Sequence, residues 1–314
     1  MKIKKYLVLV LVMGLVFTSC KKDDDSTSSE PERDRTEQQV EDKEALLLYF
    51  DTHYYNSSDF ETAGDYSIDD IVISELPTDA DGNYMALPDP ANNTMLSDIG
   101  VLETYTTTHL EVEYDYYILR LNTGGGDTPH FTDDVRLNYS GNLEDGDIFD
   151  STVNPTKFDL ISLISGWRNV IPKFKTSTSY VNNEDGTVTY SDYGVGVMFI
   201  PSGLAYFAIP PAGVTSYANL IFKFELYQTE VNDHDSDGVP SYMEDLDGNL
   251  DIYDDDTDGD LIPNFLDFDD DDDEVLTINE DLDEDGDPTN DDSDNDGIPN
   301  YLDADSTASN LDDE

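Results

Sequence analysis

The sequence predicts an α+β protein made of three different regions. In the middle of the chain, segments such as LEVEYDYYILRL and ANLIFKFEL alternate or cluster apolar residues as strands do, with turn-rich stretches between them. Nearer the start, EDKEALLLYFDTHYY places apolar residues at helical spacing after an acidic beginning. The last quarter has neither pattern, because 34 of the 72 acidic residues lie beyond residue 231 without one Lys or Arg among them. A chain of 314 residues can hold one sizeable domain plus appendages.

The first 19 residues have the form of an export signal. Three lysines, Lys2, Lys4 and Lys5, precede an apolar run of about 12 residues that is too short to span a bilayer and fits a signal peptide. Cys20 is the only cysteine, so no disulfide framework exists, and it stands where a bacterial lipoprotein signal places its lipidated residue. We expect residues 1–19 to be removed and Cys20 to anchor the protein in a membrane. The alternative is an ordinary secretory signal with an incidental thiol.

The residues after the cysteine suggest where the protein is displayed. The sequence KKDDD resembles the short lysine-plus-acid signal of lipoproteins from the Bacteroidetes group, which implies the outer face of the outer membrane; the alternative is an outer-membrane lipoprotein that faces the periplasm. Residues 20–42 are polar, charged and nearly free of apolar side chains, so we expect a disordered tether. Residues 43–109 form an accessory region that begins with the amphipathic helix and has no role evident from its sequence.

Aromatic and aliphatic side chains dominate the candidate site in the middle of the chain. Its residues are Tyr139, Phe149, Asp150, Leu163, Ile164, Trp167, Tyr206 and Phe222. Only one carboxylate is among them, so nucleophilic or two-carboxylate catalysis has few candidates. An apolar pocket suits rotation about an X-Pro bond, whose barrier of roughly 18 to 20 kcal/mol comes from amide resonance. The twisted transition state is less dipolar than the planar amide, so a dry pocket favours it.

The motifs around these residues resemble those of the FKBP family of peptidyl-prolyl cis-trans isomerases. Within residues 135–226 they occur in the family's order: YSGNLEDGDIFDST, the pair Gly166-Trp167, IPSGLAY and LIFKFEL. The resemblance implies an antiparallel sheet wrapped on a short helix over residues 110–230. It also implies an isomerase that acts on proline-containing proteins or peptides, with no cofactor for catalysis and no covalent intermediate.

The resemblance also implies a role for each candidate residue. Trp167 matches the floor of the family's proline pocket, and the walls match Tyr139, Phe149, Leu163 and Phe222. Ile164 matches the residue whose backbone N–H meets the substrate carbonyl. Tyr206 matches a tyrosine that donates a hydrogen bond near the rim, and Asp150 matches the carboxylate of the polar edge. Neither of these two acts as a base.

Three departures from the family leave a second function open. Thr156 replaces a wall aromatic, Phe207 replaces the glycine after the rim tyrosine, and residues 176–193 contain an insertion. The pair Asp185-Gly186, flanked by alternating Tyr, Val and Thr, predicts that the insertion forms a hairpin. The alternative to a foldase is therefore a catalytically weak binding module, chaperone or adhesin stalk at the cell surface.

The acidic residues of positions 232–305 follow a calcium-loop pattern. In the pattern D-x-D-x-D-G-x5-E, alternating carboxylates face one ion and an acid at the twelfth position closes the shell. Six consecutive frames fit it: Asp233, Asp235, Asp237 and Glu244; Asp245, Asp247, Asn249 and Asp256; Asp256, Asp258, Asp260 and Asp267; Asp269, Asp271, Asp273 and Glu280; Asp281, Asp283, Asp285 and Asp292; Asp292, Asp294, Asp296 and Asp303.

The frames differ in their turn residue, and this difference predicts which of them bind best. Gly238, Gly286 and Gly297 keep the glycine of the sixth position, which other residues replace in the remaining frames. Three frames share an apolar inset, VPSYM, IPNFL and IPNYL, whose proline disfavours flanking helices. The region resembles thrombospondin type 3 calcium repeats, which implies structural Ca²⁺ and little regular secondary structure.

The alternative for this region is a plain acidic tail, which we expect at residues 306–314 in any case. Such a charge makes nucleic acid a poor partner.

Overall fold

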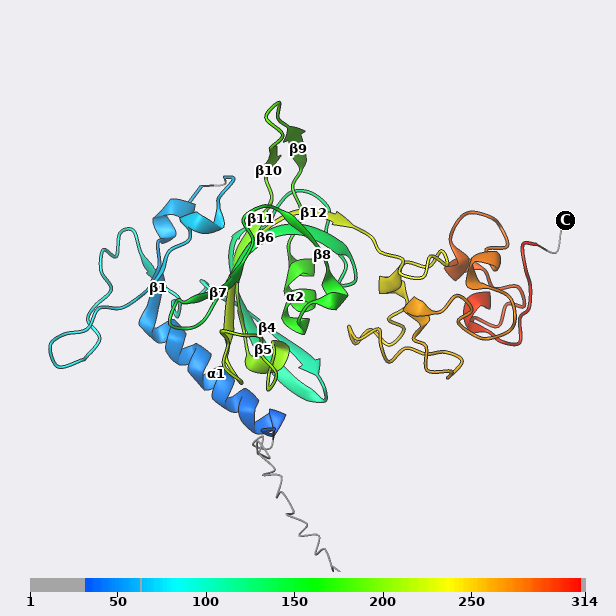
Figure 1. Ribbon diagram of the computed structural model, residues 1–314, viewed down its shortest axis with the longest axis horizontal. Coiled ribbons are helices and arrows are strands. Elements are labelled where there is room, and N and C mark those ends of the chain that lie inside the picture. The colour runs from blue at the N-terminus through cyan, green and yellow to red at the C-terminus, as the bar shows by residue number, and fades with distance from the viewer. Residues whose placement is uncertain (1–31, 63, 312–314) are drawn as a thin grey trace, which may run out of the picture. The chain divides into compact units, whose positions relative to one another are not determined.

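A seven-stranded antiparallel sheet forms the centre of the computed structural model, which describes residues 32–62 and 64–311 (Figure 1). Its strands follow the order β4-β5-β11-β12-β6-β7, and β8 pairs with the free part of β6. Their bounds are β4 Glu103–His109, β5 Val112–Asn122, β6 Asp134–Asn142, β7 Ile148–Ser151, β8 Thr156–Asp159, β11 Gly194–Ile200 and β12 Leu220–Glu230.

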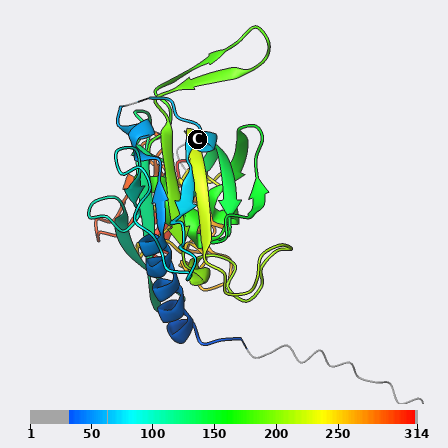
Figure 2. The same ribbon diagram turned by 90° about the vertical axis from the view of Figure 1, so that its left-hand side faces the viewer.

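The central strand β11 is buried along its whole length, because both faces of the sheet are covered. Side chains of a strand alternate between the faces. Met198 and Ile200 accordingly join a core with helix α2 (Ser165–Val170), whereas Val197 and Phe199 join a core with helix α1 (Arg35–Thr52). Figure 2 shows α1 from the side, in blue, along the strands. The accessory region therefore covers the second face of the sheet.

Helix α1 corrects the predicted tether. The helix begins at Arg35, where the Asp34 side chain accepts hydrogen bonds from the backbone N–H groups of Thr36 and Glu37. Such an N-cap satisfies donors that a helix start leaves open. Gln38 and Asp42 are 4% and 2% exposed, although their polarity suggested a disordered segment. Residues 1–31, with the predicted signal and Cys20, lie outside the described residues.

The edge strand β4 corrects the predicted start of the central domain at residue 110. It pairs with β5 from Glu103↔Ile118 to His109↔Val112, so a boundary at 110 would cut this hairpin. The accessory region also holds a small antiparallel sheet of β1 (His53–Tyr55), β2 (Ile73–Glu75) and β3 (Thr94–Met95). The hairpin predicted in the insertion is confirmed as β9 (Ser179–Asn182) and β10 (Val188–Ser191).

The acidic region contains only short 3₁₀ turns among its described residues, 231–311. They are Ser241–Met243, Asn264–Leu266, Thr277–Asn279, Pro288–Asn290 and Asn300–Leu302. Others lie earlier in the chain, at Ser57–Phe60, Ile68–Asp70, Leu160–Ser162, Ile171–Lys173 and Ser202–Leu204. The predicted fold class is confirmed: an antiparallel sheet with short helices, followed by a largely irregular acidic region.

Two further features concern the C-terminal residues and the helices. Ser306 is 7% exposed and Asn310 donates to the carbonyl oxygen of Asn279, so the predicted disordered tail at 306–314 is wrong up to about residue 310. Residues 312–314 are outside the described part.

Within the described ranges, none of the helices is both long and apolar enough to cross a membrane.

Candidate functional sites

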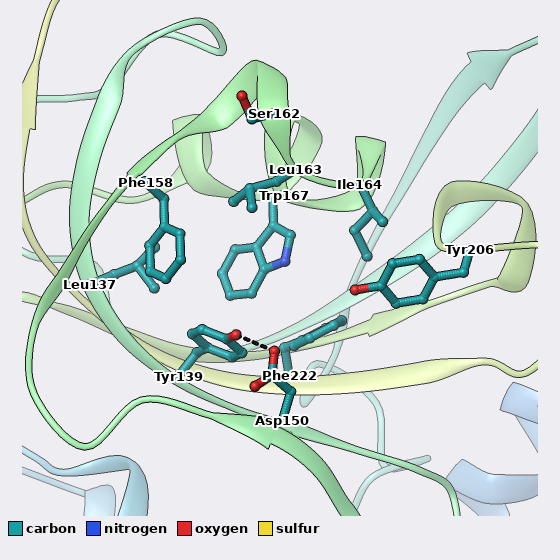
Figure 3. Close-up of a pocket in the computed structure, with 10 residues that line it drawn as sticks. All are labelled: Leu137, Tyr139, Asp150, Phe158, Ser162, Leu163, Ile164, Trp167, Tyr206 and Phe222. Atoms are coloured by element: carbon teal, nitrogen blue, oxygen red, sulfur yellow. Dashed lines mark hydrogen bonds between the residues drawn. The ribbon is translucent and has the colours of Figure 1, made fainter. Parts of the chain in front are cut away.

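A pocket of about 180 Å³ opens between α2 and the strands β6, β7 and β12 (Figure 3). Strand alternation places Leu137 and Tyr139 of β6 on one face, and the 3₁₀ turn Leu160–Ser162 leads into the opposite wall. The lining consists of Leu137, Tyr139, Asp150, Phe158, Ser162, Leu163, Ile164, Trp167, Tyr206 and Phe222.

Trp167 lies at the base of the pocket and is 4% exposed. Its ring centroid is 5.6 Å from that of Tyr139, edge to face, and 5.0 Å from that of Phe222. Gly166 allows this placement, since a Cβ there would come within 2.8 Å of the Ile200 side chain. The helix can therefore approach β11 closely enough to fix the indole against the sheet.

The polar edge of the pocket is a hydrogen bond between Tyr139 and Asp150. The Tyr139 hydroxyl donates to Oδ2 of Asp150 at 2.5 Å, drawn dashed in Figure 3, and Oδ1 of Asp150 accepts from the Ser151 N–H. Burial, and then this bond to the carboxylate, raise the pKa of the Tyr139 hydroxyl above its usual range. Tyr139 therefore stays neutral and keeps donating at physiological pH.

Two hydrogen-bond donors border the pocket, and their residues, Ile164 and Tyr206, lie next to each other in Figure 3. Figure 3 shows the half-buried Tyr206 with its hydroxyl directed into the pocket, and burial raises the pKa of this hydroxyl, with a further contribution from Asp150. The Ile164 residue is the N-cap of α2. In the described part of the chain, its backbone N–H donates to no other protein group. Both groups are thus available to a bound carbonyl.

Seven of the eight predicted pocket residues line this space, and Phe149 does not. Phe149 packs edge to face against Phe222, with ring centroids 5.6 Å apart, and supports it from behind. A Cβ on Gly141 would come within 2.7 Å of Phe149 and 2.9 Å of Phe222, so this close packing requires the glycine. The sequence reasoning missed Leu137, Phe158 and Ser162; the alternation with Tyr139 could have indicated Leu137.

The three departures from the family leave the pocket open. Thr156 is exposed on β8, and Phe158 contacts Tyr139 edge to face at 5.8 Å. Phe207 keeps a left-handed backbone, with φ at 49°, although it is not glycine. The inserted hairpin packs elsewhere: Tyr190 stacks on Tyr227 at 4.3 Å in the core that α1 shares.

The six acidic frames adopt one loop conformation whether or not they contain glycine. Their fourth and sixth residues all have positive φ values, for example Ser236 at 69° and Leu261 at 81°. In five frames the first Asp accepts a hydrogen bond from the N–H of the sixth residue, as Asp233 does from Gly238 at 3.2 Å. The frames at 245 and 256 lack the sixth-position glycine but have Gly248 and Gly259 at the fourth.

Carboxylate oxygens converge in these loops at distances suited to a cation. Within each of five groups, one ligand atom per residue lies within 4.8 Å of the others: Asp233, Asp235 and Asp237; Asp237, Glu244 and Asp270; Asp245, Asp247 and Asp255; Asp256, Asp258 and Asp260; Asp269, Asp271 and Asp273. Burial raises the pKa of Glu244 to about 10 and that of Glu280 to about 9, with neighbouring carboxylates adding to both. Several carboxylate oxygens gathered this closely are suitable ligands for Ca²⁺, which prefers oxygen ligands.

The residues that approach two of the loops differ from those predicted. Asp255, not the predicted Asp256, joins Asp245 and Asp247. Asp256 instead begins its own loop, accepting from the N–H groups of Gly259 and Leu261. Asp270 belongs to no predicted frame. It follows Asp269 directly, so a spacing of two could not indicate it.

Comparison with known proteins relates the two regions to different families. The chain is 29% identical over 111 residues to the FKBP-type 22 kDa peptidyl-prolyl cis-trans isomerase of Escherichia coli (strain K12), covering 34% of this chain and 47% of that protein. It is 29% identical over 127 residues to the FKBP-type peptidyl-prolyl cis-trans isomerase FkpA of Aeromonas hydrophila, covering 40% and 41%. The chain thus spans less than half the length of these relatives.

The solved structure of FkpA from Escherichia coli is similar over 40% of this chain and 51% of that one, with 25% identity and a TM-score of 0.31. In the acidic region, residues 234–288 match the family model described as BamM C-terminal. Part of this chain is therefore homologous to the FKBP-type peptidyl-prolyl cis-trans isomerases, and a separate part matches the BamM C-terminal family.

Proposed function

We propose that the protein is a peptidyl-prolyl cis-trans isomerase that acts on proline-containing proteins or peptides. The observation that carries the proposal is the pocket itself. An aromatic floor at Trp167, an available N–H at Ile164 and a neutral hydroxyl at Tyr206 surround a space of about 180 Å³. The homology to FKBP-type isomerases supports the same reaction.

In this proposal the proline ring lies on Trp167, between the side chains of Tyr139 and Phe222. The Ile164 N–H holds the substrate carbonyl, while Tyr206 donates a second hydrogen bond at the rim. Because rotation reduces the dipole of the amide, the apolar walls stabilise the twisted bond relative to the planar one. The Asp150 carboxylate orients Tyr139 and takes no proton, so no covalent or acid–base step is required.

An isomerisation assay on the full chain in detergent, with several X-Pro peptides, tests this proposal. We expect Trp167→Leu to abolish most activity. Asp150→Ala should lower kcat/KM by at least about tenfold, because a hydrogen bond to a charged group is worth roughly 1.5 to 3 kcal/mol. The matched control is Asp147→Ala, an exposed carboxylate on the same hairpin. If the wild-type protein isomerises none of the peptides, the proposed enzymatic activity is wrong, and the alternative of a binding module with the same fold is favoured.

A second function is favoured by the acidic region, which we propose binds structural Ca²⁺. Its proposed ligands are the alternating acids of the six frames, with Asp255 in place of Asp256 as the closing acid of the second. The convergence of oxygens within 4.8 Å and their burial support this proposal. Isothermal titration of CaCl₂ into the metal-free full chain should show several sites. Absence of binding at millimolar calcium would contradict it.

We also propose attachment to the outer membrane through lipidated Cys20, with the protein facing the cell exterior. The short apolar run before Cys20 and the KKDDD sequence after it support this location. Cys20→Ser should release the protein from the membrane fraction. Protease treatment of intact cells should digest the wild type; full protection in intact cells would contradict display at the surface.

A further inference from the structure

One fully buried acidic cluster in the described part of the protein combines residues from separate frames. Asp237 and Glu244 belong to the first frame, and Asp270 lies 26 residues beyond Glu244. Their exposed fractions are 1%, 0% and 2%. Carboxylates are rarely buried to this degree without a partner, because an uncompensated charge loses its hydration.

The oxygens in this cluster point at one another without a hydrogen-bond donor. Among the described residues, both Oε atoms of Glu244, Oδ2 of Asp237 and Oδ1 of Asp270 have no hydrogen-bond partner. Each residue offers an oxygen within 4.8 Å of the other two. Oxygens on opposite sides of a calcium ion at about 2.4 Å are about 4.8 Å apart, so the spacing fits one ion.

We propose that Asp270 completes a buried calcium site with Asp237 and Glu244, so that one ion joins the first frame to a segment of the fourth. This inference rests on the proposal that the acidic region binds calcium. The adjacent Asp271 belongs to a different group, with Asp269 and Asp273. Two consecutive residues therefore serve two sites and hold them next to each other.

The surrounding residues support a closed site. Thr277 donates to the other oxygen of Asp270, Oδ2, at 3.3 Å and leaves Oδ1 directed to the cluster. Tyr301 of the sixth frame is 3% exposed, and burial raises its pKa, with further contributions from Asp270 and Glu244. An ion held here links the first frame to the fourth, so the region folds back on itself instead of forming an extended row of independent loops.

The test is calcium titration and hydrogen exchange on the full chain, comparing Asp270→Asn with Asp272→Asn. Asp272 is exposed and two residues away, so its variant removes the same charge without touching the cluster. We expect Asp270→Asn to lose one calcium, or to bind it at least about tenfold more weakly, as the loss of a buried charged partner predicts. Exchange protection of residues 239–244 should fall with it, whereas Asp272→Asn should match the wild type.

Two further measurements separate this site from a general effect on folding. Glu244→Gln should remove the same calcium, and the double variant should lose no more than either single one. Without calcium, Asp270→Asn and the wild type should show the same low exchange protection over residues 232–311, because neither then holds the ion. The proposal of a shared site would be wrong if Asp270→Asn lost exchange protection only in residues 269–280. It would also be wrong if Asp270→Asn and Asp272→Asn behaved alike. A wild type that binds no calcium would instead refute the parent proposal.

Discussion

Phe207 shows how a side chain can offset backbone strain at the rim of the pocket. Its φ of 49° is in the left-handed region that favours glycine. The ring is 4% exposed, contacts Tyr217 edge to face at 5.0 Å, and has the Arg35 guanidinium 3.9 Å from its centroid. Burial and the cation–π contact offset a backbone cost of about 1 to 2 kcal/mol. The residue after Tyr206 therefore keeps the conformation without the glycine.

Leu261 also has a left-handed backbone, but its side chain is not buried and so does not offset the strain. It therefore allows the cost of this strain to be measured. Its φ is 81° and its side chain is 88% exposed. Leu261→Gly should raise the free energy of unfolding of the calcium-bound region by about 1 kcal/mol, the left-handed cost less the added entropy of glycine. Thermal unfolding in the presence of calcium measures this change in stability.

The control for this change is Leu276→Gly, an exposed leucine with φ at −71°. Glycine there relieves no strain and should only destabilise the region. Equal effects of the two substitutions would show that backbone strain at the sixth loop position is not what limits stability.

At the scale of elements, helix α1 supports the segment that leads to the pocket rim. Asp42 of α1 accepts from both the N–H and the hydroxyl of Ser202, at 2.9 and 2.6 Å, and from Gln38 at 2.7 Å. Ser202 begins the 3₁₀ turn Ser202–Leu204 that precedes Tyr206. A helix of the accessory region thus holds a loop of the isomerase-like domain in place.

We predict that Asp42→Ala lowers the free energy of unfolding by about 1 to 3 kcal/mol, because it leaves buried donors without a partner. Asp42→Asn keeps an acceptor for Ser202, but the Gln38 carbonyl oxygen already accepts from Arg33, so this variant loses the Gln38 bond and should be destabilised less than Asp42→Ala. Denaturant unfolding of the full chain gives both values. In the isomerase assay, only the alanine variant should lose activity; equal activity in all three proteins would exclude a role of α1 at the rim.

At the scale of the whole molecule, the formal charge of −57 is distributed unevenly, and the acidic region holds little apolar core. Ile252 and Phe265 of this region form a small buried cluster with Phe131 of the sheet side, whereas two large cores enclose the sheet. Repulsion among 34 acids therefore acts on a segment with little burial to oppose it. Bound cations both neutralise the charge and stabilise the folded form by mass action.

Calcium removal should consequently unfold one region and spare the other. In EDTA we expect residues 232–311 to lose hydrogen-exchange protection, while β11 and β12 keep theirs. At the sheet side, the residues that contact this region should loosen, among them Phe131, Ile161 and His130, which stacks on Tyr242. Simultaneous loss of protection in the strands would contradict this independence, and unchanged protection throughout would show that the acidic region needs no ion.

Local patterns of the sequence predicted the fold class, and the resemblance of its motifs to the FKBP family predicted most of the residues that line the pocket. Alternation in β5 and β12, helical spacing in α1 and the order of the motifs are all visible in the chain, and the acid spacing of two marks the loops. Other pocket-lining residues, including Phe158 and Ser162, could be identified only from the structure, because their positions depend on the path of β8 and of the turn after it. The role of residues 43–109 also appeared only when α1 was seen to cover the sheet.

Tertiary structure alone decided the features that depend on long-range contact. Asp42 has the polarity of a tether and is buried because Ser202 lies 160 residues away in sequence yet donates to it. Asp270 occupies no predicted ligand position in any frame and meets Glu244 only because the chain folds back. Residue patterns with short spacing are set by the local backbone and are therefore visible in the sequence. A buried charge needs a partner, and only the folded chain determines which distant residue that partner is.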